Sequence, residues 1–235
     1  MVKQELVQRS PIRILEKSMR GGLKAGEIGV VSSKKGIGKT AVLVQIALDK
    51  LMQGQKVIHV SFTQEANHVI SWYEDIFEEI SRKKNLEKAD EVKSDAVKNR
   101  VIMNFNQDSL SAGQIIKSLN ALIVDGGFGA QALIVDGYDF AKTDSATMQE
   151  IKAFAEKAGI EVWFSCTVSA PEAVYDKKSL PAVLKAIQDE IDVIVVLDPK
   201  ADYIQFNVAK DRKDFHPSSF GDLKLDAKTF LVAEK

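Results

Sequence analysis

The fold of this chain is decided by the stretch Ser33-Lys34-Lys35-Gly36-Ile37-Gly38-Lys39-Thr40. It follows the apolar run Ile28–Val31 and precedes Ala41–Leu48, whose apolar residues favour a helix. Gly36 and Gly38 can adopt backbone angles that let the main chain approach an anion closely. A strand, a glycine-bearing turn and a helix N-terminus together aim backbone N–H groups and the positive end of the helix dipole at one point. The stretch therefore predicts a phosphate-binding turn.

The same stretch matches the phosphate-loop pattern G-x-x-x-x-G-K-[ST] at every fixed position but the first, where Ser33 replaces glycine. In this pattern Lys39 would reach the β- and γ-phosphates of a nucleotide, and the Thr40 hydroxyl would bind Mg²⁺. We therefore expect ATP or ADP with Mg²⁺; a glycine-rich turn with a chance lysine is the alternative. The residues expected at the nucleotide are Ser33, Lys34, Lys35, Gly36, Ile37, Gly38, Lys39, Thr40, Ala41 and Asp136.

A phosphate loop needs a second acidic group to hold Mg²⁺, and Ala132–Asp136 has the required form. It is an apolar strand pattern that ends in a carboxylate. Because the carboxyl ends of parallel strands face one crevice, Asp136 should lie near the Ser33–Thr40 loop. We expect Asp136 to act on Mg²⁺ through a water molecule. Asp139 lies close by in the sequence and is equally well explained as a loop or capping residue.

Apolar runs alternate with helical periodicity along nearly the whole chain. This pattern predicts one α/β domain over residues 1–235, doubly wound around a mainly parallel sheet. The predicted strands are Glu27–Ser33, Lys56–Phe62, Arg100–Asn106, Ala132–Asp136, Glu161–Val168 and Asp192–Leu197. Alternating patterns at 203–208 and 222–226 predict antiparallel strands added at the C-terminal edge. The charged stretch near 81–99 predicts an exposed helix extension or a mobile loop.

Composition limits the class of protein. The 235 residues are 45% hydrophobic and 28% charged, which is ordinary for a soluble globular chain. The net charge of −1 gives no general attraction to nucleic acid. Cys166 is the lone cysteine, which excludes an internal disulfide and fits a reducing compartment. The start of the chain lacks the apolar core of a signal peptide, and no apolar run is long enough to span a bilayer. We expect a cytoplasmic protein.

Two further segments give a resemblance to a known superfamily. Gly21–Glu27, directly before the first predicted strand, resembles the segment that leads into the fold of RecA-superfamily ATPases, in particular the KaiC, RadA and DnaB-type branch. Lys210 and Arg212 form the K-x-R pair of these relatives. The resemblance implies a RecA-like fold and a homo-oligomer in which Lys210 and Arg212 support the γ-phosphate of the neighbouring subunit's nucleotide. The alternative is two solvated charges in a basic turn.

The sequence departs from these relatives at the catalytic glutamate, which they place just past the second strand. Thr63 and Gln64 occupy that place here, and Glu65 follows a residue or two late. Glutamine can orient a water but is a very poor proton acceptor, and losing a general base typically costs about 10²–10⁴-fold in rate. Glu65 recovers the role if the turn is one residue longer; an exposed glutamate in the first turn of a helix is the alternative.

A second departure is at the fifth strand, where relatives often carry a glutamine or histidine that senses the γ-phosphate. Cys166 or Thr167 takes that place, and Cys166 is best explained as a small buried residue. Other residues are expected to carry no chemistry. His59, His68 and His216 lack metal-ligand spacing, Trp72 and Tyr73 fit a core better than a base-stacking platform, and Lys177 and Lys178 are too few to indicate DNA binding.

Three functions remain open from the sequence. The first is an oligomeric ATPase that moves a partner. The second, favoured by the missing glutamate and sensor, is a nucleotide-switched regulatory or scaffold module with little hydrolysis. The third follows from Lys34, because Lys34–Thr40 is similar to the K-G-G-x-G-K-[ST] loop of dimeric MinD and ParA-type ATPases except at Lys35. We expect an ATP- and Mg²⁺-binding protein whose hydrolysis is weak or depends on an oligomer or a protein partner.

Overall fold

The computed structural model describes residues 3–168, 180–215 and 223–234. Its strands are β1 (Ile28–Ser33), β2 (Val57–Ser61), β3 (Arg100–Asn104), β4 (Ala132–Asp136), β5 (Glu161–Thr167), β6 (Val193–Pro199), β7 (Tyr203–Asp211), β8 (Asp214–Phe215), β9 (Leu223–Asp226) and β10 (Val232–Glu234). They form one sheet in the order β10-β9-β7-β6-β1-β5-β4-β2-β3, with β8 beside β7.

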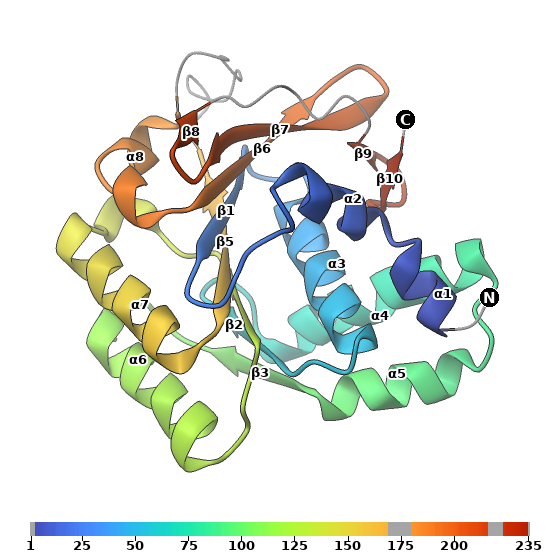
Figure 1. Cartoon of the computed structure of the whole chain (residues 1–235), viewed down its shortest axis with the longest axis horizontal. Coiled ribbons are helices and arrows are strands. Elements are labelled where there is room, and N and C mark those ends of the chain that lie inside the picture. Colours follow the sequence, from blue (N-terminus) through green and yellow to red (C-terminus); the bar gives the residue numbers. More distant parts are fainter. Residues whose placement is uncertain (1–2, 169–179, 216–222, 235) are drawn as a thin grey trace.

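Helices cover both faces of this sheet. They are α1 (Lys3–Gln8), α2 (Pro11–Ser18), α3 (Lys39–Met52), α4 (Ala66–Lys84), α5 (Ala89–Lys98), α6 (Ala112–Asn120), α7 (Ser145–Ala158) and α8 (Ala182–Lys185), with short turns η1 (Ala121–Asp125), η2 (Phe140–Lys142) and η4 (Gln188–Glu190). Figure 1 shows α6 and α7 on one side of the central strands and α3, α4 and α5 on the other.

The strands from β1 to β6 pair in parallel, and β7, β9 and β10 are added antiparallel at the C-terminal edge. The prediction of an α/β fold with a mostly parallel sheet and antiparallel strands at that edge is confirmed. Continuous apolar runs were the right signal because both faces are covered. Val30 and Val31, for example, are adjacent in β1 and lie in separate core clusters on opposite faces of the sheet.

The charged stretch near 81–99 is helical. Helix α4 continues to Lys84, and α5 follows after a short turn at Asn85 and Lys88, both of which have positive φ. The stretch thus comprises the end of α4 and a separate helix, α5. Val92 and Ala96 are the buried residues of α5, so a narrow apolar stripe packs this otherwise charged helix onto α3 and β3.

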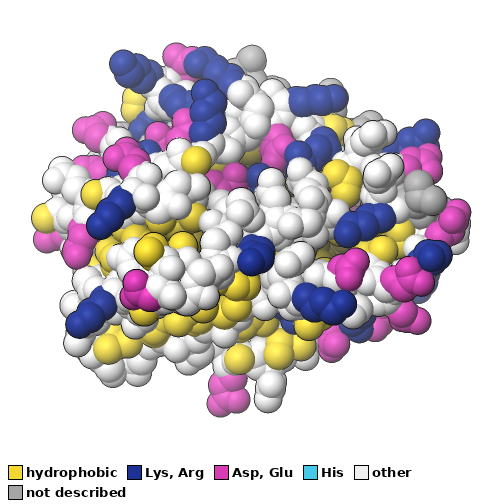
Figure 2. All heavy atoms as spheres, turned by 60° about the horizontal axis from the view of Figure 1, so that its bottom comes forward, with side chains coloured by type: hydrophobic (Ala, Val, Ile, Leu, Met, Phe, Trp, Pro, Cys, Tyr) yellow, Lys and Arg dark blue, Asp and Glu magenta, His cyan; other side chains and the backbone are white. Residues whose placement is uncertain are grey.

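Strand β3 forms the other edge of the sheet and leaves part of its apolar surface exposed. Val101 and Met103 are half-buried and pack, with Phe105 and Ile116, against the core cluster on the α6 side. Figure 2 shows hydrophobic side chains gathered across this face of the molecule. No helix in the described part of the chain is both long and apolar enough to cross a membrane.

Candidate functional site

The Ser33–Thr40 loop joins the end of β1 to the start of α3. Gly36 and Gly38 have φ of +83° and +103°, a left-handed conformation that favours glycine. Gly38 is also the N-cap of α3, and a Cβ built there would lie 2.7 Å from the Leu225 side chain and 3.0 Å from that of Phe230. Glycine is therefore required at Gly38 for space as well as for backbone angle.

Lys39 is buried within the loop, and its ammonium group is held by neutral oxygen atoms rather than by a carboxylate. Its Nζ donates to the carbonyl oxygens of Lys34 at 2.8 Å and Ser33 at 3.2 Å. No ion pair of Lys39 is present among the described residues. Burial lowers the pKa of Lys39, while nearby Asp136 acts in the opposite direction. The loop thus holds a partly desolvated cation whose charge is not neutralised by direct pairing.

Thr40 and Asp136 meet at the start of α3. The Thr40 hydroxyl donates to Asp136 Oδ2 at 2.8 Å, although the two residues are 96 positions apart in the sequence. Asp136 is the last residue of β4 and is only 4% exposed. Strand β5 lies between β1 and β4, so the carboxyl ends of the three strands open on the same side. The structure brings Asp136 to the loop, as the strand-end argument predicted.

These groups open into a cleft of about 710 Å³. Of the residues predicted at the nucleotide, those that line it are Lys35, Gly36, Gly38, Lys39, Thr40 and Asp136. Ser33, Lys34, Ile37 and Ala41 belong to the same loop and helix start but do not line the cleft wall. The side chain of Lys34 is exposed and forms no ion pair with a described residue, so its reach across a dimer stays a prediction.

Two aromatic residues border this cleft. Trp72 of α4 and Phe230 lie with ring centroids 6.3 Å apart in an edge-to-face arrangement. The indole N–H of Trp72 is buried and has no hydrogen-bond partner among the described residues. The expectation of a core role is right for Tyr73, which is 2% exposed. Trp72 is half-buried; it packs against the core cluster and also lines the cleft. Phe230 was missed, because nothing in the local sequence indicates that the tail returns to the loop.

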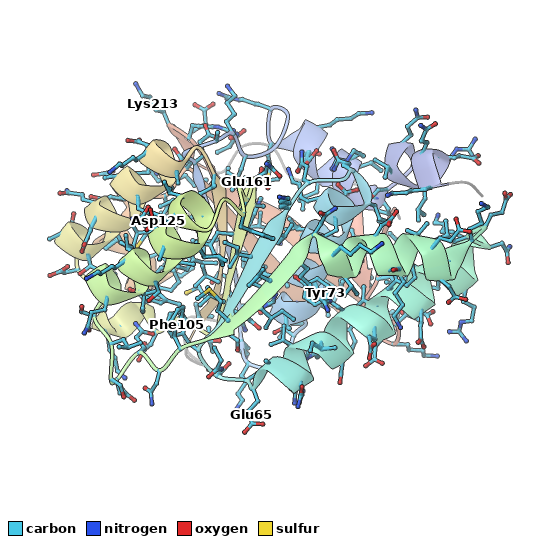
Figure 3. The ribbon with its side chains drawn as sticks, turned by 90° about the horizontal axis from the view of Figure 1, so that it is seen from below. Glu65, Tyr73, Phe105, Asp125, Glu161 and Lys213 are labelled. Carbon is cyan, nitrogen blue, oxygen red and sulfur yellow. The ribbon has the colours of Figure 1, made fainter. Side chains whose placement is uncertain are left out.

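The junction after β2 places Thr63 and Gln64 at the cleft and leaves Glu65 outside. Gln64 lines the cleft, and its side-chain oxygen is buried without a partner among the described residues. Glu65 is the exposed residue before α4, and Figure 3 shows it projecting outward at the end of the molecule. In this conformation Glu65 does not reach the space beside Thr40, and its catalytic role stays a prediction.

The end of β5 completes the cleft wall with small side chains. Ser165 Oγ accepts from the Gly137 backbone N–H at 2.8 Å, and Thr167 is exposed at the cleft. Cys166 is 1% exposed and packs in the core. Asp139 also lines the cleft, but its carboxylate accepts from Ala141 N at 3.0 Å and caps η2, which supports the capping interpretation.

Lys210 and Arg212 lie at the opposite end of the sheet. Lys210 is 5% exposed and donates to the carbonyl of Ile191 at 2.5 Å. Arg212 pairs with Glu27, with Nη2 at 2.5 Å from Oε2, and donates to the Met19 and Gly22 carbonyls. Figure 3 shows Lys213, the next residue, at the end of the molecule away from Glu65. These contacts replace the solvated-turn interpretation, while action on a neighbouring subunit stays a prediction.

His59 is buried in β2, whereas His68 is exposed on α4. His59 Nδ1 lies 3.1 Å from the Tyr73 hydroxyl, and burial lowers the pKa of His59 to about 4. Within the described ranges no cluster of three His, Cys, Asp or Glu side chains could hold a metal ion. His216, Lys177 and Lys178 lie outside the described residues.

No protein-family model matches this chain, and no curated protein matches it. The geometry of the cleft and the sequence that forms it are therefore the evidence for function.

Proposed function

We propose that this chain is a RecA-like P-loop protein that binds ATP or ADP with Mg²⁺ at the Ser33–Thr40 loop, and that hydrolysis is weak or depends on an oligomer or a partner. The observation that carries the proposal is the 2.8 Å hydrogen bond from Thr40 to Asp136 beside the buried Lys39. A hydroxyl, a carboxylate and an ammonium group meet there at the N-terminus of a helix. That combination suits a phosphate chain with its metal ion.

The loop supports binding of the phosphates. Lys39 donates to neutral oxygens, the Ser33 and Lys34 carbonyls and the Ser33 hydroxyl, and a charged phosphate oxygen is a stronger acceptor than any of them. The free N–H groups at the start of α3 and the helix dipole add favourable interactions with the same anion. A bound phosphate would therefore draw Lys39 away from the backbone of the loop.

Thr40 and Asp136 would hold Mg²⁺. Because the Thr40 hydroxyl donates its hydrogen bond to Asp136, the lone pairs of the hydroxyl oxygen remain available to a cation. Mg²⁺ keeps several of its waters in protein sites, and the carboxylate of Asp136 can accept hydrogen bonds from one of them. An ion held there would offset the negative charge of the phosphates.

Trp72 and Phe230 would contact the organic part of the nucleotide. Both rings border the cleft, and they lie edge to face with their centroids 6.3 Å apart. Bases stack on aromatic side chains irrespective of their identity, so this pair supports binding of a nucleotide rather than of inorganic phosphate alone.

A titration by calorimetry with ATP and ADP, paired with a phosphate-release assay on the same sample, tests the proposal. We expect micromolar binding that depends on Mg²⁺ for ATP, and a loss of affinity of about 10²-fold or more in Lys39→Ala, since each 1.4 kcal/mol is tenfold. Lys117→Ala, an exposed lysine on α6, is the matched control and should bind like the parent. Affinities that are equal in both variants would contradict a nucleotide site at this loop.

The same experiment separates the second candidate function, a nucleotide-switched module without significant hydrolysis. Gln64 favours it, because this amide stands at the cleft where relatives carry a catalytic glutamate. Tight binding with no measurable turnover, in the presence of a partner or without one, would support the module. Brisk hydrolysis by the pure protein would support the enzyme.

A further inference from the structure

A second cleft lies apart from the loop, between the N-terminal helices, the C-terminal half of α3, the end of α4 and strand β10. Its volume is about 580 Å³, and it shares no lining residue with the first cleft. Volumes of about 300–1,000 Å³ are typical of small-molecule sites.

The floor of this cleft is largely apolar. Its buried apolar side chains come from four separate elements and the residue before β10: Leu6, Ile12, Met52, Leu231 and Val232. The buried polar residues Ser10, Gln45 and Asp49 also line the cleft. Ile80 of α4 is half-buried and adds apolar surface nearer the opening. No aromatic side chain is among the described lining residues, so the floor suits an aliphatic chain better than a stacked base.

The rim is basic. Lys17 of α2 and Lys83 and Lys84 of α4 are exposed at the cleft. Lys17 and Lys84 form no ion pair with any described residue, and Lys83 donates to the neutral Thr229 hydroxyl at 3.2 Å. These ammonium groups surround an apolar floor in a chain whose net charge is −1, which makes the local charge distinct from that of the whole molecule.

The other charged residues at this cleft largely neutralise one another. Asp49 is the acidic residue among those that line it, and it pairs with Arg13, which also pairs with Glu16 at 2.7 Å. Arg9 lies at the rim and pairs with Glu5 at 3.2 Å. Lys17 and Lys84 are therefore the charges available to a ligand, and Lys83, which also interacts electrostatically with Asp226, adds to them.

We propose that this cleft binds a small amphipathic anion, an aliphatic body that carries one carboxylate or phosphate group. The body lies on the floor between α1, α3 and β10, where its burial removes apolar surface from water. The anionic group lies at the rim between Lys17 and the pair Lys83 and Lys84. This site is independent of the proposed nucleotide site.

Calorimetry with the full chain tests this inference, with decyl phosphate and decanoate as probes below their micelle concentrations. We expect one molecule bound per chain, and binding weaker by about tenfold or more for decyltrimethylammonium, which carries the opposite charge on the same chain length. The double variant Lys83→Glu with Lys84→Glu should weaken binding of decyl phosphate by a similar factor. Ile80→Glu, which puts a negative charge at the opening and so repels the anionic probe, should also weaken binding of decyl phosphate.

The matched control reverses two exposed lysines on the other face, Lys117→Glu with Lys157→Glu, and should keep the affinity of the parent. Melting temperatures of all variants show whether each remains folded. Equal loss of affinity in both double variants, equal binding of the cationic probe, or many molecules bound per chain would overturn the inference. Binding to phosphatidylglycerol vesicles without binding of the soluble probes would also overturn it and would point to a membrane surface instead.

Discussion

At the scale of single residues, Gln64 has the largest influence on the proposed chemistry. Its side-chain oxygen is buried at the cleft and has no partner among the described residues. An amide oxygen can accept a hydrogen bond from a water but takes no proton from it at neutral pH. On the proposed function, Gln64 would therefore supply no general base at the cleft, and hydrolysis would be slow.

Gln64→Glu should supply the missing base. We expect the rate of phosphate release at saturating ATP to rise by about 10²-fold or more, while the affinity for ADP changes little because Gln64 lies beyond the loop that would hold the phosphates. Glu65→Gln is the matched control, since Glu65 is exposed and does not line the cleft. A rate that stays at the parent level in Gln64→Glu, with ATP still bound, would show that a missing base does not limit the reaction.

At the scale of elements, the turn between β9 and β10 is fixed to the helix that follows the loop. Gln45 of α3 donates to the Phe230 carbonyl at 2.8 Å and accepts from Val232 N at 2.7 Å. Phe230 has φ of +53°, which is unusual for a bulky residue, and its ring lies against Gly38. A buried amide on α3 thus holds the tail over the start of its own helix.

Gln45→Ala should loosen this turn and lower the free energy of unfolding by about 1–3 kcal/mol, because it leaves a buried N–H and a buried carbonyl without partners. Urea denaturation followed by the fluorescence of the two tryptophans, Trp72 and Trp163, measures the effect. Gln53→Ala is the control; Gln53 donates to the Asp49 carbonyl and carboxylate at the end of the same helix, without touching the tail. If Gln53→Ala lowered the free energy of unfolding as much as Gln45→Ala does, the contact of Gln45 with the tail would contribute no stability of its own.

The elements differ in how far the sequence predicts them. Each predicted parallel strand forms. These strands were predictable because burial on both faces favours continuous apolar runs, which can be recognised in the sequence. Asp136 was predicted at the loop for a topological reason, since ends of parallel strands share an edge. Phe230 was not predicted, because its position depends on Gln45, 185 residues away, and on no local pattern. The short strand β10 was missed for the same reason.

At the scale of the whole molecule, the two ends of the sheet are built differently. The cleft occupies the carboxyl ends of the parallel strands, while the other end carries ion pairs such as Lys50 with Glu161 at 2.9 Å and Arg212 with Glu27. The two segments that carry the RecA resemblance, around Glu27 and around Arg212, therefore contact each other. No sequence signal indicated this pairing. Action of Arg212 on a neighbouring subunit would require it to leave these contacts.

Stability of the whole fold should depend on pH through His59. Burial lowers the pKa of His59 to about 4, whereas the unfolded chain protonates this histidine near pH 6.5. The unfolded state therefore binds more protons between these values, so the free energy of unfolding falls as pH drops from about 6.5 to about 4 and the loss is complete below that range.

We expect His59→Gln to lose less stability over this pH range than the parent, by on the order of 3 kcal/mol, in urea denaturation measured at several pH values. His68→Gln, at an exposed position on α4, should keep the slope of the parent. If the free energy of unfolding depended on pH equally in both variants, folding would not lower the pKa of His59.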